Sequence, residues 1–229
     1  MNMTQKIFTL GVSLMAITLG TGVLHASSIQ DTVVSATEIL GRKQGSAHPI
    51  PPATLQKAKG IAILSITKAG LVVGGAGGDG VVMVRGAAKS LSMPQWSAPI
   101  PVGYTGGSFG AQIGVSSINM IILLNSESAV KIFTQSGKLN WNATASGTVG
   151  SDSGSEHKGG MLSDQDVTIY KETDGLYGGA TIGGAELNIQ TDRIDSAYGQ
   201  GVTVSEILSG KVNVPDYSRH LYEFMDGKH

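Results

Sequence analysis

The chain has 229 residues, of which 41% are hydrophobic and 14% charged, and its formal net charge is −1. A chain of this size and hydrophobicity can bury a core, so a disordered protein is excluded, and the absence of a basic excess argues against a nucleic-acid binder. The 33 glycines favour a turn-rich β architecture, and the lack of cysteine means that no disulfide supports it.

Residues 1–26 have the pattern of a secretory signal peptide. Lys6 precedes an apolar stretch over residues 7–23, and Ala26 supplies a small residue before the expected cleavage point. The alternative is an uncleaved membrane anchor, although glycines and threonines interrupt this short stretch. The pattern predicts export, and hence a periplasmic or secreted protein.

The segment 27–54 is predicted to hold an amphipathic helix followed by a proline-rich loop. Ser27 and Gln30 have capping-box spacing, apolar residues recur on one face, and Gly41 provides a stop. Pro52 can open a second short helix that ends before Gly60. We place the main domain over residues 55–229.

The main domain begins with strands and ends with helices. Alternating or β-branched runs predict strands, and capping residues with helical periodicity predict a mid-chain helix after Asn125 or Ser126 and short C-terminal helices. The fold expected is α+β, with an antiparallel sheet curled into a barrel or sandwich. The predicted strands are 61–65, 71–73, 81–85, 109–115, 120–124, 139–149, 166–170 and 176–189, and residues 96–102 are predicted to form an edge strand or an extended crossing because they contain two prolines. The predicted C-terminal helices are 192–198, 204–208 and 216–225.

Residues 75–80 satisfy the dinucleotide pattern G-x-G-x-x-G by letter. A phosphate cradle needs a helix N-terminus directly after the glycines, whereas Val81, Val82, Met83 and Val84 are strand-like. The acidic residue expected about 20 positions later is also missing. We therefore interpret the glycines as a hairpin turn.

Residues 106–110 satisfy the hydrolase pattern G-x-S-x-G around Ser108, but no helical segment follows the serine. A serine esterase stays open as an alternative function. Its candidate partners are Asp152, Asp164, Asp166, His157 and His220. No metal site or cofactor is predicted, because the sequence has no H-E-x-x-H motif, cysteine cluster or EF-hand loop.

Cations gather in the stretch from Leu55 to Arg85. Lys57, Lys59, Lys68 and Arg85 lie beside apolar and glycine-rich turns, a combination suited to anionic phospholipid headgroups. The alternative is that they are ordinary solvated side chains at strand ends.

The chain resembles the SYLF domain family from about Leu55 to Met225. The resemblance is carried, in order, by AKGIAI at 58–63, KAG at 68–70, GDGV at 78–81, WSAP at 96–99, GGSFGAQIG at 106–114, GLYGG at 175–179, AYG at 197–199 and EILSG at 206–210. It implies phospholipid binding without enzymatic activity, with basic residues near the N-terminal helix and first strands meeting the membrane.

We therefore expect a non-catalytic protein that binds an anionic phospholipid membrane surface through Lys57, Lys59, Lys68, Arg85 and Trp96. Eukaryotic relatives also suggest a protein-interaction module, with an unknown protein partner. The chain departs from the family at Ala76, where an arginine is frequent, and at residues 147–151. Because these cations are missing, bulk anionic phospholipid is the expected ligand rather than a specific phosphoinositide.

Overall fold

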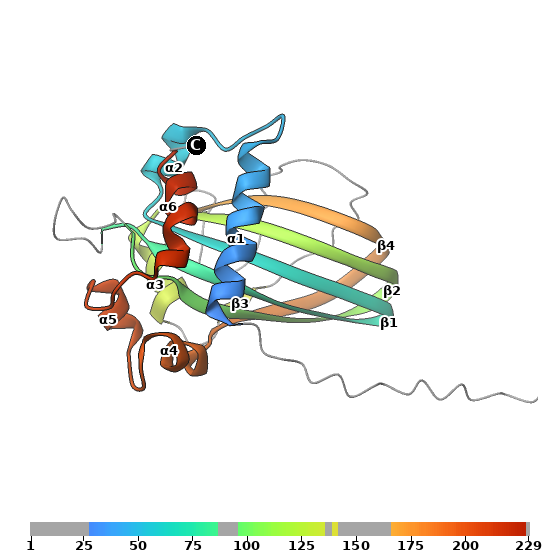
Figure 1. Cartoon of the computed structure of the whole chain (residues 1–229). Coiled ribbons are helices and arrows are strands. Elements are labelled where there is room, and N and C mark those ends of the chain that lie inside the picture. The colour runs from blue at the N-terminus through green and yellow to red at the C-terminus, as the bar shows by residue number, and fades with distance from the viewer. Residues whose placement is uncertain (1–27, 87–95, 136–138, 142–165, 228–229) are drawn as a thin grey trace, which may run out of the picture.

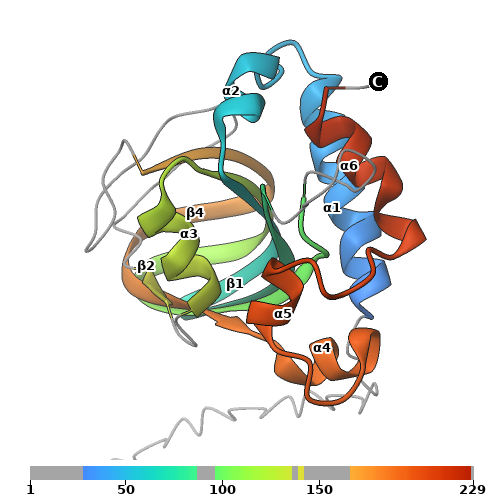
Figure 2. The same cartoon turned by 90° about the vertical axis from the view of Figure 1, so that its left-hand side faces the viewer.

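The computed structural model describes residues 28–86, 96–135, 139–141 and 166–227. It confirms the α+β class: an antiparallel sheet with the strand order β1-β2-β4-β3 curls strongly, and helices lie on its outer face and around one end (Figures 1 and 2). The predicted signal peptide and most of the predicted strand 139–149 fall outside the described residues.

The elements follow the chain as helices, long strands and helices again. Their bounds are α1 Ile29–Gln44, α2 Pro52–Lys57, β1 Gly60–Val84, β2 Ile100–Leu124, α3 Glu127–Gln135, β3 Leu139–Trp141, β4 Val167–Ile189, α4 Thr191–Tyr198, α5 Val204–Leu208, the 3₁₀ turn η1 Asp216–Ser218 and α6 Arg219–Met225. The C-terminal helices therefore lie within a residue or so of their predicted positions.

The first helix is capped one residue later than predicted, and it is longer. Ser28 accepts a hydrogen bond from the backbone N–H of Asp31, whose carboxylate accepts one from the Ser28 backbone N–H, so these two residues form the capping box. Gly41 does not stop α1. A Cβ there would lie 3.2 Å from the Phe224 ring of α6, so this glycine allows the two helices to pack closely.

The predicted strands 61–65, 71–73 and 81–85 are parts of the single strand β1. It folds back on itself at Val72, where φ is +66° and the register with β2 shifts. Its two ends lie next to each other: the backbone N–H of Arg85, just after β1, donates to the carbonyl of Lys59, just before β1, at 2.7 Å. A Cβ on Gly78 would lie 2.1 Å from the Ser65 carbonyl oxygen, which explains the glycine there.

The hairpin turn predicted at residues 75–80 is therefore wrong. These residues lie within the returning arm of β1 and pair with β2, and the bend is at Val72. β2 pairs with β4 from Val102 to Leu124, and both strands pass around the bend of β1. Each of the three long strands therefore bends around the one before it. The strands expected separately at 109–115 and 120–124 are likewise one strand, β2.

Side chains alternate between two hydrophobic clusters, one on each face of the curled sheet. The outer cluster packs β1 against α1, α2 and α6 and includes Ile61, Ile63, Val81, Met83, Val33 and Leu221. The inner cluster joins the concave face to α3, α4 and α5 and includes Leu64, Val82, Ile100, Phe133, Ile194 and Ile207. The helices cover only one end of the sheet, and the strands extend beyond them on the right of Figure 1.

Candidate functional site

The nucleotide pattern at residues 75–80 does not form a phosphate site. A cradle requires backbone N–H groups that converge at a helix N-terminus. Here Gly75 pairs with Gly107, Gly80 pairs with Val102, and the chain continues as strand to Val84. The backbone amides are thus used in the sheet.

Ser108 lies in the middle of β2, between Gly74 of β1 and Gly183 of β4. A nucleophile elbow needs a sharp turn into a helix, whereas β2 continues as strand to Leu124. His220, on α6, contacts the Glu223 carboxylate at 2.9 Å, and Asp166 accepts hydrogen bonds from Ser126 and Ser128. Asp152, Asp164 and His157 fall outside the described residues.

Arg85 and Trp96 come together where β1 meets the C-terminal helix. The guanidinium lies over the Trp96 ring at 4.1 Å from its centre and donates to the carbonyls of Ala58 and Leu55, each at 3.2 Å. The Trp96 indole is 2% exposed and donates to the Asp226 carboxylate at 3.1 Å. Burial lowers the pKa of Arg85 from its ordinary value, and the Asp226 charge opposes that shift. Through these contacts, Arg85 and Trp96 connect Leu55, near the start of the main domain, with Asp226, near its end.

Lys57 and Lys59 are exposed at the junction between α2 and β1. The Lys59 ammonium lies 2.9 Å from the Glu127 carboxylate, but both side chains are well exposed, so the pair is weak and can exchange with another anion. The junction is fixed from beneath by Arg85, through its bonds to Leu55 and Ala58. These two lysines therefore project from a rigid base.

Lys68 lies apart from the other predicted site residues. It is on the outgoing arm of β1, eight residues after Gly60, and strand geometry puts it roughly 25 Å along the strand from the junction. The structure thus brings Lys57, Lys59, Arg85 and Trp96 to one end of the sheet and places Lys68 near the bend.

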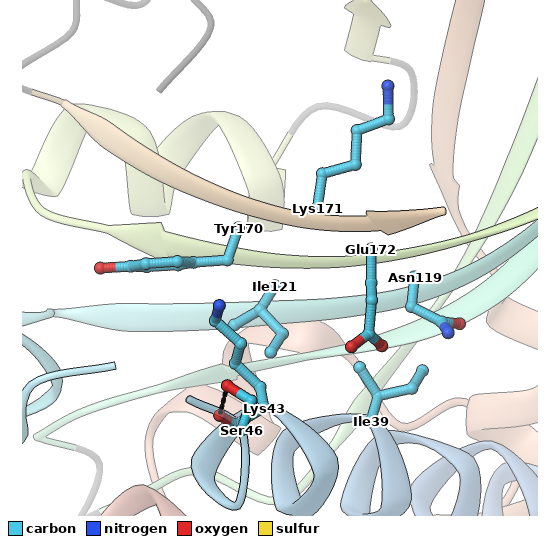
Figure 3. Close-up of a pocket in the computed structure, with 8 residues that line it drawn as sticks. All are labelled: Ile39, Lys43, Ser46, Asn119, Ile121, Tyr170, Lys171 and Glu172. Carbon is cyan, nitrogen blue, oxygen red and sulfur yellow. Dashed lines mark hydrogen bonds between the residues drawn. The ribbon is translucent and has the colours of Figure 1, made fainter. Parts of the chain in front are cut away.

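A shallow pocket between α1 and the outer face of the sheet holds a buried cation that the sequence did not single out. Lys43 is 8% exposed, and its ammonium lies 5.6 Å from the centre of the Tyr170 ring. Glu172 lines the same pocket and pairs with Arg42 at 3.8 Å, while Lys171 points away from it (Figure 3). The sequence does contain a signal for the burial of Lys43: it follows the apolar Ile39 by four residues, which puts both on the same face of α1.

Two further features concern the described ranges of the chain. None of the helices there combines the length and the hydrophobicity that a membrane crossing requires. Within the same ranges, no three histidine or acidic side chains are grouped as metal ligands would be.

Comparison with known proteins identifies related chains. A family model described as the Las17-binding protein actin regulator matches residues 105–228. The SH3 domain-containing YSC84-like protein 1 of Xenopus laevis is 33% identical over 190 residues, which are 82% of this chain and 55% of the relative. Protein YSC84 of Saccharomyces cerevisiae is 29% identical over 209 residues, 89% of this chain and 42% of the relative. LAS seventeen-binding protein 3 from the same yeast is 28% identical over 209 residues, 89% of this chain and 43% of the relative.

The chain thus spans about half the length of these curated relatives. No solved structure matches it significantly. The predicted periplasmic or secreted location is contradicted, because the relatives are proteins of eukaryotes and the matching family is described as an actin regulator.

The family model covers 124 of the 229 residues, more than half of the chain, and relatives above 30% identity match more than four fifths of it. These matches agree with the SYLF motifs in the sequence. The chain belongs to the SYLF domain family, the family of the Las17-binding actin regulators.

Proposed function

We propose that this chain is a non-catalytic phospholipid-binding module that acts at a membrane surface. The observation that carries the proposal is the exposed pair Lys57 and Lys59, which projects from the α2–β1 junction held by Arg85. Cations so placed can meet lipid phosphates without any rearrangement of the core. The resemblance to the SYLF family supports the same ligand.

The predicted site residues take different roles in this proposal. Lys57, Lys59 and Lys68 supply charge, and each cation near an anionic surface contributes about 1 kcal/mol. Arg85 and Trp96 are positioning residues, because their stacking and their bonds to Leu55, Ala58 and Asp226 fix the junction from which Lys57 and Lys59 project.

The test is vesicle co-sedimentation of the triple variant Lys57→Gln/Lys59→Gln/Lys68→Gln with phosphatidylserine-containing vesicles. The matched control is Lys131→Gln/Lys171→Gln/Lys211→Gln, which removes the same charge from other parts of the described chain. We expect the first variant to bind more weakly and the control to bind as the wild type does. Equal binding by both variants would contradict the assignment of these lysines.

The non-catalytic part of the proposal is supported by the position of Ser108 inside β2. An ester-hydrolysis assay on the wild type and Ser108→Ala tests it. We expect equal, background-level rates from the two proteins. A wild-type rate that Ser108→Ala abolishes would instead establish the serine esterase alternative.

A protein-interaction module is the second candidate function, and the description of the matching family favours it. Because the chain spans about half of each relative, the binding named for those proteins need not lie in the matched half. The test is direct binding of purified Las17 to this chain by interferometry. Saturable binding would support the candidate, and its absence would restrict Las17 binding to other parts of the relatives.

A further inference from the structure

The exposed apolar side chains of this chain gather where the long strands bend. In the part of the chain that the structure describes, six large hydrophobic residues are exposed, and five of them lie at this bend: Leu71, Val72, Val73, Ile113 and Val115. Leu71 and Ile113 are 69% and 66% exposed and pair directly across β1 and β2. We call these five residues the bend patch.

Four members of the bend patch share one face of the sheet. Side chains alternate along a strand, and paired residues share a face. Ile61 and Ile63 belong to the outer cluster, so Leu71 lies on the outer face with them, as does its partner Ile113. Counting from Ile121 on β2 and from Val81 on the returning arm of β1 places Val115 and Val73 on this face too.

The outer face changes character in rows from the helices to the bend. The row Ile63–Ile121–Tyr170 lies at α1, and the next two rows, Ser65–Asn119–Glu172 and Thr67–Ser117–Asp174, are polar. Beyond them Ala69 pairs with Val115, and Leu71 pairs with Ile113. A polar band thus separates the buried core from an apolar end, as in a protein that lies part-way into a membrane interface.

The bend can leave water at little electrostatic cost, and its central strand is paired on both sides. No charged residue occurs in residues 69–78 of β1, in the whole of β2 or in residues 175–185 of β4, and these segments include the bends of the three strands. Their backbones pair with one another, in triplets such as Gly70–Gly114–Tyr177 and Val73–Phe109–Ile182. Charges and unpaired backbone groups are the two main penalties of entering lipid. The first is absent from these segments, and the second is reduced where β2 pairs with both of its neighbours.

The observations favour lipid over a second copy of the chain as the occupant of the bend patch. A stable protein interface usually needs about 20–30 residues on each side. Among the side chains that the structure describes, the bend patch offers five exposed apolar ones. A few apolar side chains are sufficient to anchor a protein when a nearby cation, here Lys68 on β1, adds to the attraction.

We propose that the bend patch inserts into the acyl region of a phospholipid bilayer. The inference rests on the proposed function and adds a second contact to it: the bend enters the membrane, and the polar rows lie at headgroup level. Lys68 is the predicted site cation near this contact, whereas Lys57 and Lys59 lie at the other end of the sheet and make a separate, charge-dependent contact. Glu172 and Asp174 lie in those rows, so this contact does not depend on anionic headgroups and is made to phosphatidylcholine as well.

Two variants remove the bend patch without disturbing the core. Leu71→Ser/Ile113→Ser changes two exposed, paired side chains, and we expect partitioning into mixed phosphatidylcholine–phosphatidylserine vesicles to weaken by about tenfold or more. Val72→Asn replaces a β-branched residue at φ +66° by one that tolerates this conformation, so it weakens binding while the thermal midpoint stays equal or rises. Val34→Asn is the matched control, because Val34 is 47% exposed on α1.

Insertion depth gives a second readout. A tryptophan introduced by Ile113→Trp should be quenched by brominated phosphatidylcholine, whereas one introduced by Val34→Trp should not. Wild-type binding with unaffected bend variants and no quenching at position 113 would overturn the insertion but leave the proposed function intact. Failure of the wild type to bind any vesicle would overturn both. A wild-type dimer that Leu71→Ser/Ile113→Ser dissociates, without a change in lipid binding, would assign the bend patch to a second copy.

Discussion

Gly78 has a steric role that its neighbour Gly77 does not share. A Cβ at position 78 would lie 2.1 Å from the Ser65 carbonyl oxygen and 2.8 Å from the Ile66 Cα, both of which belong to backbone in the other arm of β1. A Cβ at position 77 would have no atom within 4 Å. The same glycine run therefore contains one residue that the fold requires and one that it does not.

We predict that Gly78→Ala destabilises the protein by about 1–3 kcal/mol or more, because the two arms of β1 must separate to admit the methyl group. Urea denaturation followed by circular dichroism measures this change. Gly77→Ala is the control and should change the free energy of unfolding by at most about 1 kcal/mol, in the stabilising direction if anything. Equal effects of the two substitutions would show that the arms of β1 are not in contact.

Among the elements, α1, α4 and the returning arm of β1 meet at a polar contact. Arg193 of α4 lies 3.2 Å from the Asp79 carboxylate and donates to the Thr32 hydroxyl at 3.3 Å. Gln190 also donates to Asp79, at 3.1 Å. The Arg193 side chain is only 10% exposed, so its charge depends on these partners. This contact helps to orient the N-terminal helix relative to the C-terminal segment.

We predict that Arg193→Leu lowers the free energy of unfolding by about 2–3 kcal/mol, because it leaves Asp79 without its guanidinium partner in a half-buried site. Adding Asp79→Asn should recover about 1 kcal/mol, since the uncompensated charge is then removed. Arg219→Leu breaks the exposed pair with Asp216 and should cost at most about 1 kcal/mol. Strictly additive effects of the Arg193 and Asp79 changes would contradict the coupling.

At this scale the sequence predicted the elements better than their connections. Pro52 and Gly60 located α2, the residue pattern located α4 and α5, and β-branched runs located the strand residues. The fold-back of β1 was missed because a valine occupies the positive-φ position at Val72, where a turn residue would be expected. The glycines at 75–80 indicated the turn instead, although they serve the close approach of the two arms.

The candidate site was predictable only in part, because tertiary contacts also decide which of its side chains are exposed. Cationic residues can be located in a sequence. Which of them are engaged inside the fold depends on tertiary partners such as Asp226, which is 141 residues beyond Arg85. The bend patch was not recognised, because LVV at 71–73 has the pattern of any buried strand. Only the position of the helices, which cover the other end of the sheet, leaves it exposed.

For the whole molecule, the two proposals assign different forces to different parts of the surface. The chain carries 16 basic and 17 acidic residues, so no net charge draws it to an anionic membrane. Local cations at the α2–β1 junction and at Lys68 act over a Debye length, whereas the bend patch acts only on contact. Membrane binding should therefore divide into a part that salt screens and a part that it does not.

We predict that this division is visible in the salt dependence of vesicle binding between about 0.01 M and 0.15 M, where the Debye length falls from about 30 Å to about 8 Å. Wild-type binding to mixed phosphatidylcholine–phosphatidylserine vesicles should weaken with salt but not vanish. Lys57→Gln/Lys59→Gln/Lys68→Gln should bind more weakly with a flatter salt dependence, because the remaining contact is apolar. Leu71→Ser/Ile113→Ser should keep the full salt dependence and lose most binding at the higher salt. Identical salt slopes for the two variants would contradict the division, since one force would then account for both surfaces.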